Sequence, residues 1–209
     1  NERILRRLRD HYGARSTAAF DLLATIGRDC VGAVQLVPVG ESPGDVHGIE
    51  SDPLDESGVA QVLRDVTSAG PWPGSEADAF RLSIAGAQEK TALLRHRGQW
   101  CIPRGATPST HIFKLPLGLI GNVRADMRKS VEIEWLCMAL ARELGFPVAR
   151  TEIGVFEDQK ALIVERFDRK LSSDGTWWQR LPQEDFCQAA GLPPSQRYEV
   201  DGGPGIETI

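Results

Sequence analysis

The amino-acid sequence predicts an α+β fold, because two kinds of pattern follow one another along the chain. The first 70 residues are dominated by apolar residues at helical spacing, and the region after residue 74 by short apolar runs between turn residues. Gly-Pro-Trp-Pro-Gly (70–74) is a rigid connector between them and a natural domain boundary. We expect three parts: a subdomain of helices and strands over 1–70, a strand-rich domain over 71–170, and the beginning of a helical lobe over 171–209.

The composition is that of a soluble globular protein. Of the 209 residues, 41% are hydrophobic and 25% are charged, and no apolar run is long enough to cross a bilayer. The charged N-terminus is unlike a signal peptide. A net charge of −5 argues against a chain that wraps nucleic acid by itself, so the arginines between Arg3 and Arg9 are predicted to be the solvated side of an amphipathic helix.

The cysteines, which are Cys30, Cys101, Cys137 and Cys187, are widely separated and lie in apolar neighbourhoods. No two of them have the spacing of a metal site or a redox motif, and the four histidines show no ligand spacing either. We interpret the cysteines as reduced core residues of a cytoplasmic protein that has no structural metal.

In the first part of the chain, apolar periodicity predicts helices over residues 2–11 and 17–26. The apolar run 31–38 predicts a strand. A loop rich in glycine, proline and aspartate follows over 39–55, and a third helix is predicted over 57–68.

In the second part, residues 80–85 and 91–96 predict two strands that form a hairpin around a long loop. A turn at Arg97-Gly98 leads into a strand over 99–103, and 110–117 predicts a further strand. These elements are short and closely spaced, as in an antiparallel sheet.

A well-marked helix follows. Ser130 is placed to cap it, and Gly145 and Pro147 are placed to end it. Apolar residues at helical spacing predict its buried stripe, which consists of Ile133, Leu136, Cys137, Leu140 and Leu144.

The last elements are two strands, 149–157 and 160–168, on either side of a turn at Asp158-Gln159. A helix is then predicted over 181–191, with Pro182 near its first turn.

A lysine stands in the middle of the predicted strand THIFKLPL. Alternation places Phe113 and Leu115 on one face and Lys114 on the other. A lysine among apolar strand residues is costly unless it meets an anion, so Lys114 is predicted to contact phosphate. The following helix offers Glu132 and Glu134 as partners for it, and we favour Glu134. The alternative is a lysine that reaches solvent from an edge strand.

The loop AGAQEK (85–90) has no bulky side chain in its first half. Backbone N–H groups there can approach phosphate oxygens closely, and Gln88 and Lys90 add donors. The sequence matches neither GxGxxG nor GxxxxGK, so a solvated hairpin turn is the alternative.

A third segment, VERF (164–167), follows an apolar strand. Backbone groups of Glu165 and Phe167 are predicted to form a hinge that reads an adenine edge. The alternative is a strand end that simply turns polar.

The order of these features is that of a protein-kinase-like small lobe, with a mixed or antiparallel sheet. A strand, a small-residue loop and a strand come first, followed by a strand with a central lysine, a helix bearing acids, and a hairpin with a polar end. In such a lobe the loop covers the nucleotide phosphates and the lysine binds them.

Several segments together resemble one protein family. They are RLSIAGAQEKTALL, GQWCIPRGATPSTHIFKLP, EWLCMALARELG, ALIVERFDR and RLPQEDFCQAAGLPPSQRYEVDGGPGI. They are similar to the bacterial HipA serine/threonine kinases, the toxins of HipBA type II toxin–antitoxin modules that are linked to persistence. The resemblance runs from about Ile4 to Ile209 and implies a HipA-type, ATP-binding small lobe over 71–170.

The resemblance also implies a role for each segment. The residues that it assigns to ATP binding are Ala85, Gly86, Ala87, Gln88, Glu89, Lys90, Lys114, Glu165, Arg166 and Phe167. It makes Ser83 the autophosphorylation site. Phosphorylated Ser83 would carry about −1.5 to −2 charges beside the ATP phosphates and so favour ejection of the loop.

As a whole, the resemblance implies an ATP-dependent protein serine/threonine kinase that uses Mg²⁺ and phosphorylates a component of translation, such as glutamyl-tRNA synthetase. Its implied partners are a DNA-binding antitoxin of the HipB type and, through it, operator DNA. The family's catalytic and metal-binding aspartates follow the DGGPGI segment, so we expect none of them within these 209 residues. The chain is interpreted as a fragment lacking both ends and inactive alone.

Two other functions are open to such a chain. A non-catalytic module from a truncated or split gene would keep nucleotide or antitoxin contacts without chemistry, and downstream sequence with an HxD-like motif and a second aspartate motif would argue against it. A hydrolase that uses Ser83 with Lys90 is disfavoured, because no histidine or aspartate partner stands near and the spacing is not SxxK.

Overall fold

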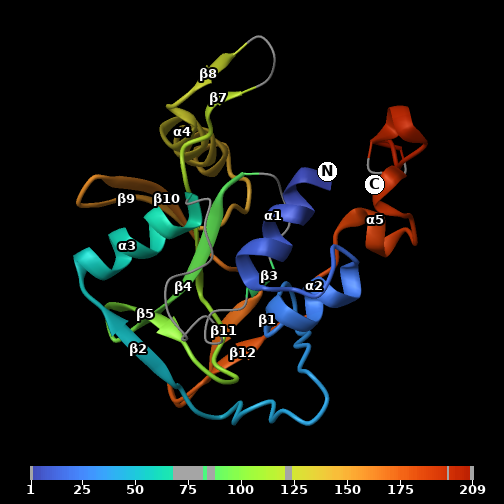
Figure 1. Ribbon diagram of the computed structural model, residues 1–209. Coiled ribbons are helices and arrows are strands. Elements are labelled where there is room, and N and C mark those ends of the chain that lie inside the picture. The colour runs from blue at the N-terminus through green and yellow to red at the C-terminus, as the bar shows by residue number, and fades with distance from the viewer. Residues whose placement is uncertain (1, 68–81, 84–87, 121–123, 197, 208–209) are drawn as a thin grey trace.

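The computed structural model describes residues 2–67, 82–83, 88–120, 124–196 and 198–207 (Figure 1). At its centre is a six-stranded sheet in which every neighbouring pair is antiparallel. In spatial order its strands are β2 (Ser51–Leu54), β5 (Gln99–Pro103), β4 (Lys90–His96), β6 (His111–Lys114), β10 (Gln159–Glu165) and β9 (Thr151–Phe156). The predicted α+β fold is confirmed.

Five helices lie within the described residues, and the last of them, α5 (Phe186–Ala189), is near the C-terminus (Figure 1). The N-terminal helices α1 (Glu2–Tyr12) and α2 (Ala19–Ile26) contact one another, and α3 (Glu56–Thr67) packs on the sheet. The fourth, α4 (Ser130–Glu143), contacts β9 and β10. The helices predicted over 2–11, 17–26 and 57–68 are therefore confirmed to within two residues at each end.

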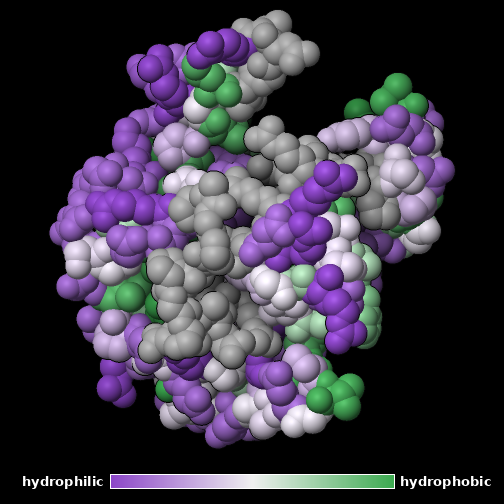
Figure 2. All heavy atoms as spheres, in the orientation of Figure 1, coloured by the Kyte–Doolittle hydropathy of each residue, from purple (hydrophilic) through white to green (hydrophobic). Residues whose placement is uncertain are grey.

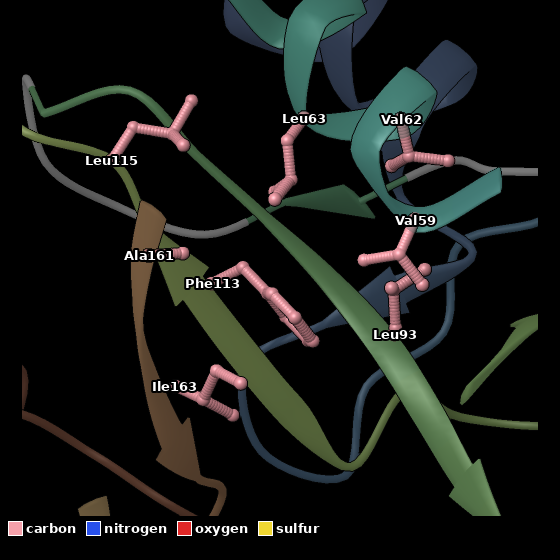
Figure 3. Close-up of a cluster of buried hydrophobic side chains, with 8 residues drawn as sticks. All are labelled: Val59, Val62, Leu63, Leu93, Phe113, Leu115, Ala161 and Ile163. Carbon is pink, nitrogen blue, oxygen red and sulfur yellow. The ribbon is translucent and has the colours of Figure 1, made fainter. Parts of the chain in front are cut away.

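The main core lies between α3 and one face of the sheet (Figure 3). Alternation along β4, β6 and β10 sends every second side chain to this face. The buried members are Val59, Val62, Leu63, Leu93, Phe113, Leu115, Ala161 and Ile163. Lys114 lies between two core residues in sequence and therefore points to the opposite face, as its strand pattern predicts.

Histidine 111 borders this core, and it makes stability depend on pH. Its ring lies edge-on to Trp100, with ring centroids 5.0 Å apart, and its Nδ1 is 2.8 Å from Thr110 Oγ1. Burial, with the charge of Arg95 as a second cause, lowers the pKa of His111 to about 4. Because an unfolded histidine binds a proton near pH 6.5, folding stability is lost as the pH falls from about 6.5 towards 4, by up to about 1.4 kcal/mol per pH unit.

Replacing His111 with glutamine is expected to remove this part of the pH dependence. Urea unfolding at pH 7 and at pH 5 measures it, as the difference in unfolding free energy between the two conditions. The matched control is His47→Gln, because His47 is solvent-exposed and should leave the wild-type difference unchanged. A His111→Gln protein as sensitive to pH as the wild type would contradict the assignment.

The N-terminal strand prediction is wrong. Residues 31–38 form no strand, and the strand β1 (Asp29–Cys30) lies just before them. Gly32 turns the chain at a φ of 74°, and Val34 beyond it is exposed, so this apolar run has no neighbouring strand to bury it. The predicted loop 39–55 contains the edge strand β2, where Pro53 is tolerated at the border of the sheet.

The predicted hairpin of residues 80–85 with 91–96 is also wrong. The described part of its first strand is β3 (Leu82–Ser83), which pairs in parallel with β1. The neighbours of β4 are β5 and β6. Local sequence could not distinguish these pairings, because β1 is about fifty residues away along the chain.

Helix α4 begins and buries its side chains differently from the prediction. Its N-cap is Lys129, and the Ser130 hydroxyl accepts a hydrogen bond from Leu117 N (3.0 Å) in place of capping the helix. Gly145 follows the helix at a φ of 84°, as predicted for its end. The predicted buried stripe is exposed along its length, at Ile133, Leu136, Cys137, Leu140 and Leu144. Periodicity identified the apolar face but not whether it is buried, and the residues that α4 does bury are Ser130 and Val131.

Three smaller elements were missed or misplaced in the remainder. The β7–β8 hairpin (Gly118–Ile120 and Ala125–Met127) and the β11–β12 pair (Arg169–Leu171 and Trp178–Arg180) were not predicted. The predicted helix 181–191 is shorter in the structure, where it spans Phe186–Ala189.

Helix α5 (Phe186–Ala189) begins at the N-cap Asp185, whose carboxylate accepts from Gln188 N while the Gln188 side chain accepts from Asp185 N. This capping box places Pro182 before the helix and not in its first turn. The short 3-10 turns Pro194–Gln196 and Glu199–Asp201 follow.

The turn between β9 and β10 lies one residue earlier than predicted, with Glu157 at a φ of 51°. The predicted connector 70–74 lies outside the described residues. None of the described helices is both long and apolar enough to span a membrane.

All four cysteines are free. Cys30 and Cys101 are buried, as predicted, but Cys137 is exposed on α4 and Cys187 is only partly buried. The prediction that every cysteine is a core residue is therefore wrong for these two.

Candidate functional site

An ion pair joins the end of β6 to helix α4. Lys114 Nζ lies 2.5 Å from Glu134 Oε1, and the two side chains are 26% and 34% exposed. Glu132, the other carboxylate considered, lies 2.6 Å from Lys160 Nζ instead. The sheet and the helix therefore hold Lys114 beside the carboxylate that the sequence favoured.

A second lysine stands directly opposite the first. Lys90 on β4 is the register partner of Lys114 on β6, so both side chains project from the same face of the sheet. Burial, and next to it the charge of Lys114, lower the pKa of Lys90. Like charges placed opposite one another destabilise a sheet, and this arrangement favours an anion that contacts both.

Hydrogen bonds join the second half of the predicted loop to Leu115, the residue that follows Lys114. Gln88 Nε2 donates to Leu115 O (2.8 Å), Leu115 N donates to Glu89 O (3.0 Å), and Lys90 Nζ donates to Gln88 O (2.6 Å). The loop residues Gln88 to Lys90 thus lie beside Lys114. The first half of the loop (Ala85, Gly86 and Ala87) lies outside the described residues.

The third predicted segment lies at the far end of β10. Leu162 is opposite Lys114 and Glu165 is opposite His111, so the segment lies about 10 Å further along the sheet from the lysine pair. Glu165 N donates to Arg150 O (2.9 Å). Among the described residues, the Glu165 carbonyl and the Phe167 N–H have no hydrogen-bond partner outside the strand ladders.

The Arg166 side chain is not exposed at this strand end. Its backbone N–H donates to Thr110 O (2.9 Å), and its guanidinium is 2% exposed and bonded to aspartates. The Arg166 side chain is held inside the protein by a set of buried charges, and the assignment of Arg166 to the ATP site stays a prediction.

This set, which we call the buried charge cluster, was missed by the sequence analysis. It consists of Asp29, Arg166, Asp168, Arg169 and Arg180, and each side chain is at most 10% exposed. It joins the N-terminal strand β1 to the segment that follows β10. The sequence offered a weak signal in the alternating charges of ERFDRK and none for Asp29.

The cluster shifts the ionisation of its members. Burial alone would raise the pKa of Asp168, but hydrogen bonds from Arg166 and the charges of Arg166 and Arg169 outweigh it, so this pKa lies below its ordinary value. Burial lowers the pKa of Arg169 and of Arg180. The cluster therefore keeps the Asp168 carboxylate ionised at neutral pH.

The predicted modification site, Ser83, is the last residue of β3, and its backbone pairs with Cys30 of β1. Its side chain lies outside the described part of the chain. The loop 84–87 follows it directly in sequence.

Comparison with known proteins gives matches over both halves of the chain. A family model described as HipA-like C-terminal domain matches residues 82–209, and a model described as HipA N-terminal domain matches residues 1–37. The C-terminal model therefore covers more than half of the chain.

Individual relatives agree with these models. The chain is 37% identical over 188 residues to "Putative kinase Y4mE" of Sinorhizobium fredii. This match covers 88% of this chain and 42% of that protein. It is 33% identical over 194 residues to the "Serine/threonine-protein kinase toxin HipA" of Shewanella oneidensis. This match covers 92% of this chain and 41% of that protein. The chain thus spans less than half the length of these curated relatives.

A solved structure has a similar fold. It is a chain from the complex of the Shewanella oneidensis toxin–antitoxin system HipA, HipB and its operator DNA. The match has a TM-score of 0.67 and 31% sequence identity, and covers 99% of this chain and 45% of that chain.

Proposed function

Because the chain belongs to the HipA family, we propose that it forms the nucleotide-binding part of an ATP-dependent protein serine/threonine kinase, the toxin of a type II toxin–antitoxin module. In this proposal Lys90 and Lys114 bind the ATP phosphates. The Glu165 carbonyl and the Phe167 N–H bind the adenine edge.

The observation that carries the proposal is the lysine pair with its carboxylate. Two ammonium groups that share one face of a sheet repel each other, and a polyphosphate between them removes that repulsion. Glu134 holds the Lys114 amine in place at 2.5 Å, so little side-chain entropy is lost when the phosphate arrives. A lysine that merely reached solvent would need no such partner on a helix.

The second contact region fits the other end of the nucleotide. The Glu165 carbonyl can accept from an exocyclic amine of adenine, and the Phe167 N–H can donate to a ring nitrogen. The separation of about 10 Å from the lysine pair is one that a nucleoside triphosphate can bridge. ATP supplies the phosphoryl group to be transferred, and these residues bind and orient it.

Mg²⁺ is part of the proposed reaction, but the described residues do not form a site for it. No three acidic, histidine or cysteine side chains gather within the part of the chain that the structure describes. Glu134 stands beside the proposed phosphate position, and it is paired with Lys114. We therefore assign no step to these residues through the ion.

The partners and the substrate follow from the family. A solved relative is a complex of HipA, HipB and operator DNA, and we propose a HipB-type antitoxin as the partner here, with operator DNA bound through it. A component of translation, such as glutamyl-tRNA synthetase, is the proposed protein substrate, and the cytoplasm is the place of action.

The proposal is tested with a full-length protein that contains this chain. Calorimetric titration with the non-hydrolysable ATP analogue AMP-PNP should show binding to one site, and labelled ATP with Mg²⁺ should transfer phosphate to protein serine. Absence of nucleotide binding would refute the proposal. Binding without any phosphoryl transfer would favour the non-catalytic module.

Replacing Ser83 with alanine in that protein is expected to abolish autophosphorylation and to leave transfer to other substrates intact. The physical reason is that phosphoserine at the loop entrance would place about −1.5 to −2 charges next to the nucleotide phosphates and expel the loop, whereas alanine cannot be modified. Mass spectrometry of the protein after incubation with ATP measures the modification. Phosphate found at another serine in the wild type would show that the wrong residue was chosen.

A further inference from the structure

We infer that Asp29 is a positioning residue for nucleotide binding: through the buried charge cluster it holds the adenine-binding strand end of β10 against the N-terminal strand β1. The inference rests on the proposed function, because it concerns the same nucleotide site. It adds a residue from the N-terminal part of the chain, and that residue lies outside the three segments proposed to bind ATP.

Asp29 is the centre of the cluster, and both of its oxygens are fully used. Oδ2 accepts from Ser109 N (3.0 Å), from Ser109 Oγ (2.5 Å) and from Arg166 Nη1 (3.2 Å). Oδ1 accepts from Arg169 Nη2 (2.9 Å), and Arg180 Nη2 lies 3.5 Å from it. One carboxylate of β1 thus binds three arginines from the segment at and beyond the end of β10.

Asp168 completes the connection from the other side. It accepts from Arg166 Nη2 (2.8 Å), from Arg169 Nη1 (2.9 Å) and from the backbone N–H of Gly32 (2.8 Å), the second residue after β1. The cluster therefore fastens the residues on both sides of Phe167. Phe167 itself has a side chain that is largely exposed, at 70% for the residue, so its backbone is placed by its neighbours and not by its own packing.

Backbone contacts of Cys30 strengthen this attachment. The Cys30 carbonyl accepts from Arg166 Nη2 (3.1 Å) and from Arg169 Nη2 (2.8 Å). Cys30 is also the register partner of Ser83, the residue that leads into the phosphate loop. Strand β1 thus contacts both β3 and the arginines of the segment that follows β10.

The charge balance makes the cluster sensitive to Asp29. The cluster contains three guanidinium groups and two carboxylates. Without the Asp29 charge, three buried guanidinium groups would face a single carboxylate, and removing one partner of a buried ion pair is strongly unfavourable. The arginines would then separate, and the backbone of Arg166 and Phe167 would move with them.

The test uses Asp29→Asn, which keeps the shape and removes the charge, in the full-length protein. Two probes are titrated by calorimetry: AMP-PNP, which has an adenine, and inorganic tripolyphosphate, which has none. Asp29→Asn is expected to weaken AMP-PNP binding by at least about tenfold, as expected for misaligned hydrogen bonds to the base. Tripolyphosphate binding should stay within about twofold of the wild type, because the lysine pair is unchanged.

The matched control is Asp52→Asn. Asp52 also pairs with an arginine, with its Oδ2 2.6 Å from Arg104 Nε, but at the exposed edge strand β2. This variant should bind both probes as the wild type does. Should Asp29→Asn fail to fold, Arg166→Lys replaces it, because lysine keeps the charge and loses the forked contact with Asp168.

The outcomes are distinct. Unchanged AMP-PNP affinity in the variant would overturn the inference, and so would an equal loss for both probes, which would indicate a purely structural role. A wild-type protein that binds tripolyphosphate but not AMP-PNP would also overturn it. A wild-type protein that binds neither probe would refute the proposed function, and the inference with it.

Discussion

Replacing Lys114 with alanine is expected to lower ATP-dependent phosphorylation by a full-length protein containing this chain by about 100-fold to 1,000-fold. Lys114 is the cation that the sheet and α4 hold in place, through a contact of 2.5 Å with Glu134. Removing it takes away a charge from the phosphates and leaves the Glu134 carboxylate beside them, where it repels the nucleotide. Initial rates with labelled ATP, at several ATP concentrations, measure the loss.

A matched control is available on the same helix. Lys160 also pairs with a glutamate of α4, with its Nζ 2.6 Å from Glu132 Oε1, but it lies on β10, two residues before Leu162, the register partner of Lys114. Lys160→Ala should retain the wild-type rate to within about twofold, because an exposed ion pair contributes little. Unaltered activity in Lys114→Ala would contradict its role. An equal loss in both variants would mean that the lysines only anchor the helix.

Replacing Phe113 with alanine is expected to lower the free energy of unfolding by about 3–5 kcal/mol. Phe113 is fully buried in the core under α3 (Figure 3). Its ring lies edge-on to Trp100, with ring centroids 4.9 Å apart. The substitution removes the ring from the centre of the sheet and leaves a cavity that neighbours on three strands cannot fill. Urea denaturation, followed by far-ultraviolet circular dichroism, measures the change at constant m-value.

Phe20→Ala is the control for this prediction. Phe20 is exposed on α2, and its replacement should change the unfolding free energy by no more than about 0.5 kcal/mol. A loss of less than about 1 kcal/mol for Phe113→Ala would contradict the central place of this residue in the core. The comparison separates burial from the chemical nature of the substitution.

The coloured part of the face shown in Figure 2 is largely hydrophilic, with separate hydrophobic patches. One patch lies over the C-terminal segment, where Phe186, Tyr198, Val200 and Ile206 are exposed. The exposed stripe of α4 is a second apolar surface. Sequence periodicity identified the α4 stripe correctly as apolar, but burial depends on which element packs against it.

The candidate site could be predicted in part. The alternation in β6 predicts that Phe113 is in the core and Lys114 is on the other face, because a strand has a side-chain period of two. The choice of Glu134 over Glu132 agrees with the ion pair in the structure. The opposite position of Lys90 was not predicted, because the register between two strands depends on the turns and contacts of the folded chain.

The sequence by itself determined the helices α1, α2 and α3, most of the central strands and the pairing of Lys114 with a carboxylate of α4, because these depend on periodicities within one segment. Only the tertiary structure decided the parallel pairing of β1 with β3 and the contact of Asp29 with Arg166, which are 137 residues apart. Such contacts form because buried charges must find partners of opposite sign wherever the fold brings them together, and no local pattern records that requirement.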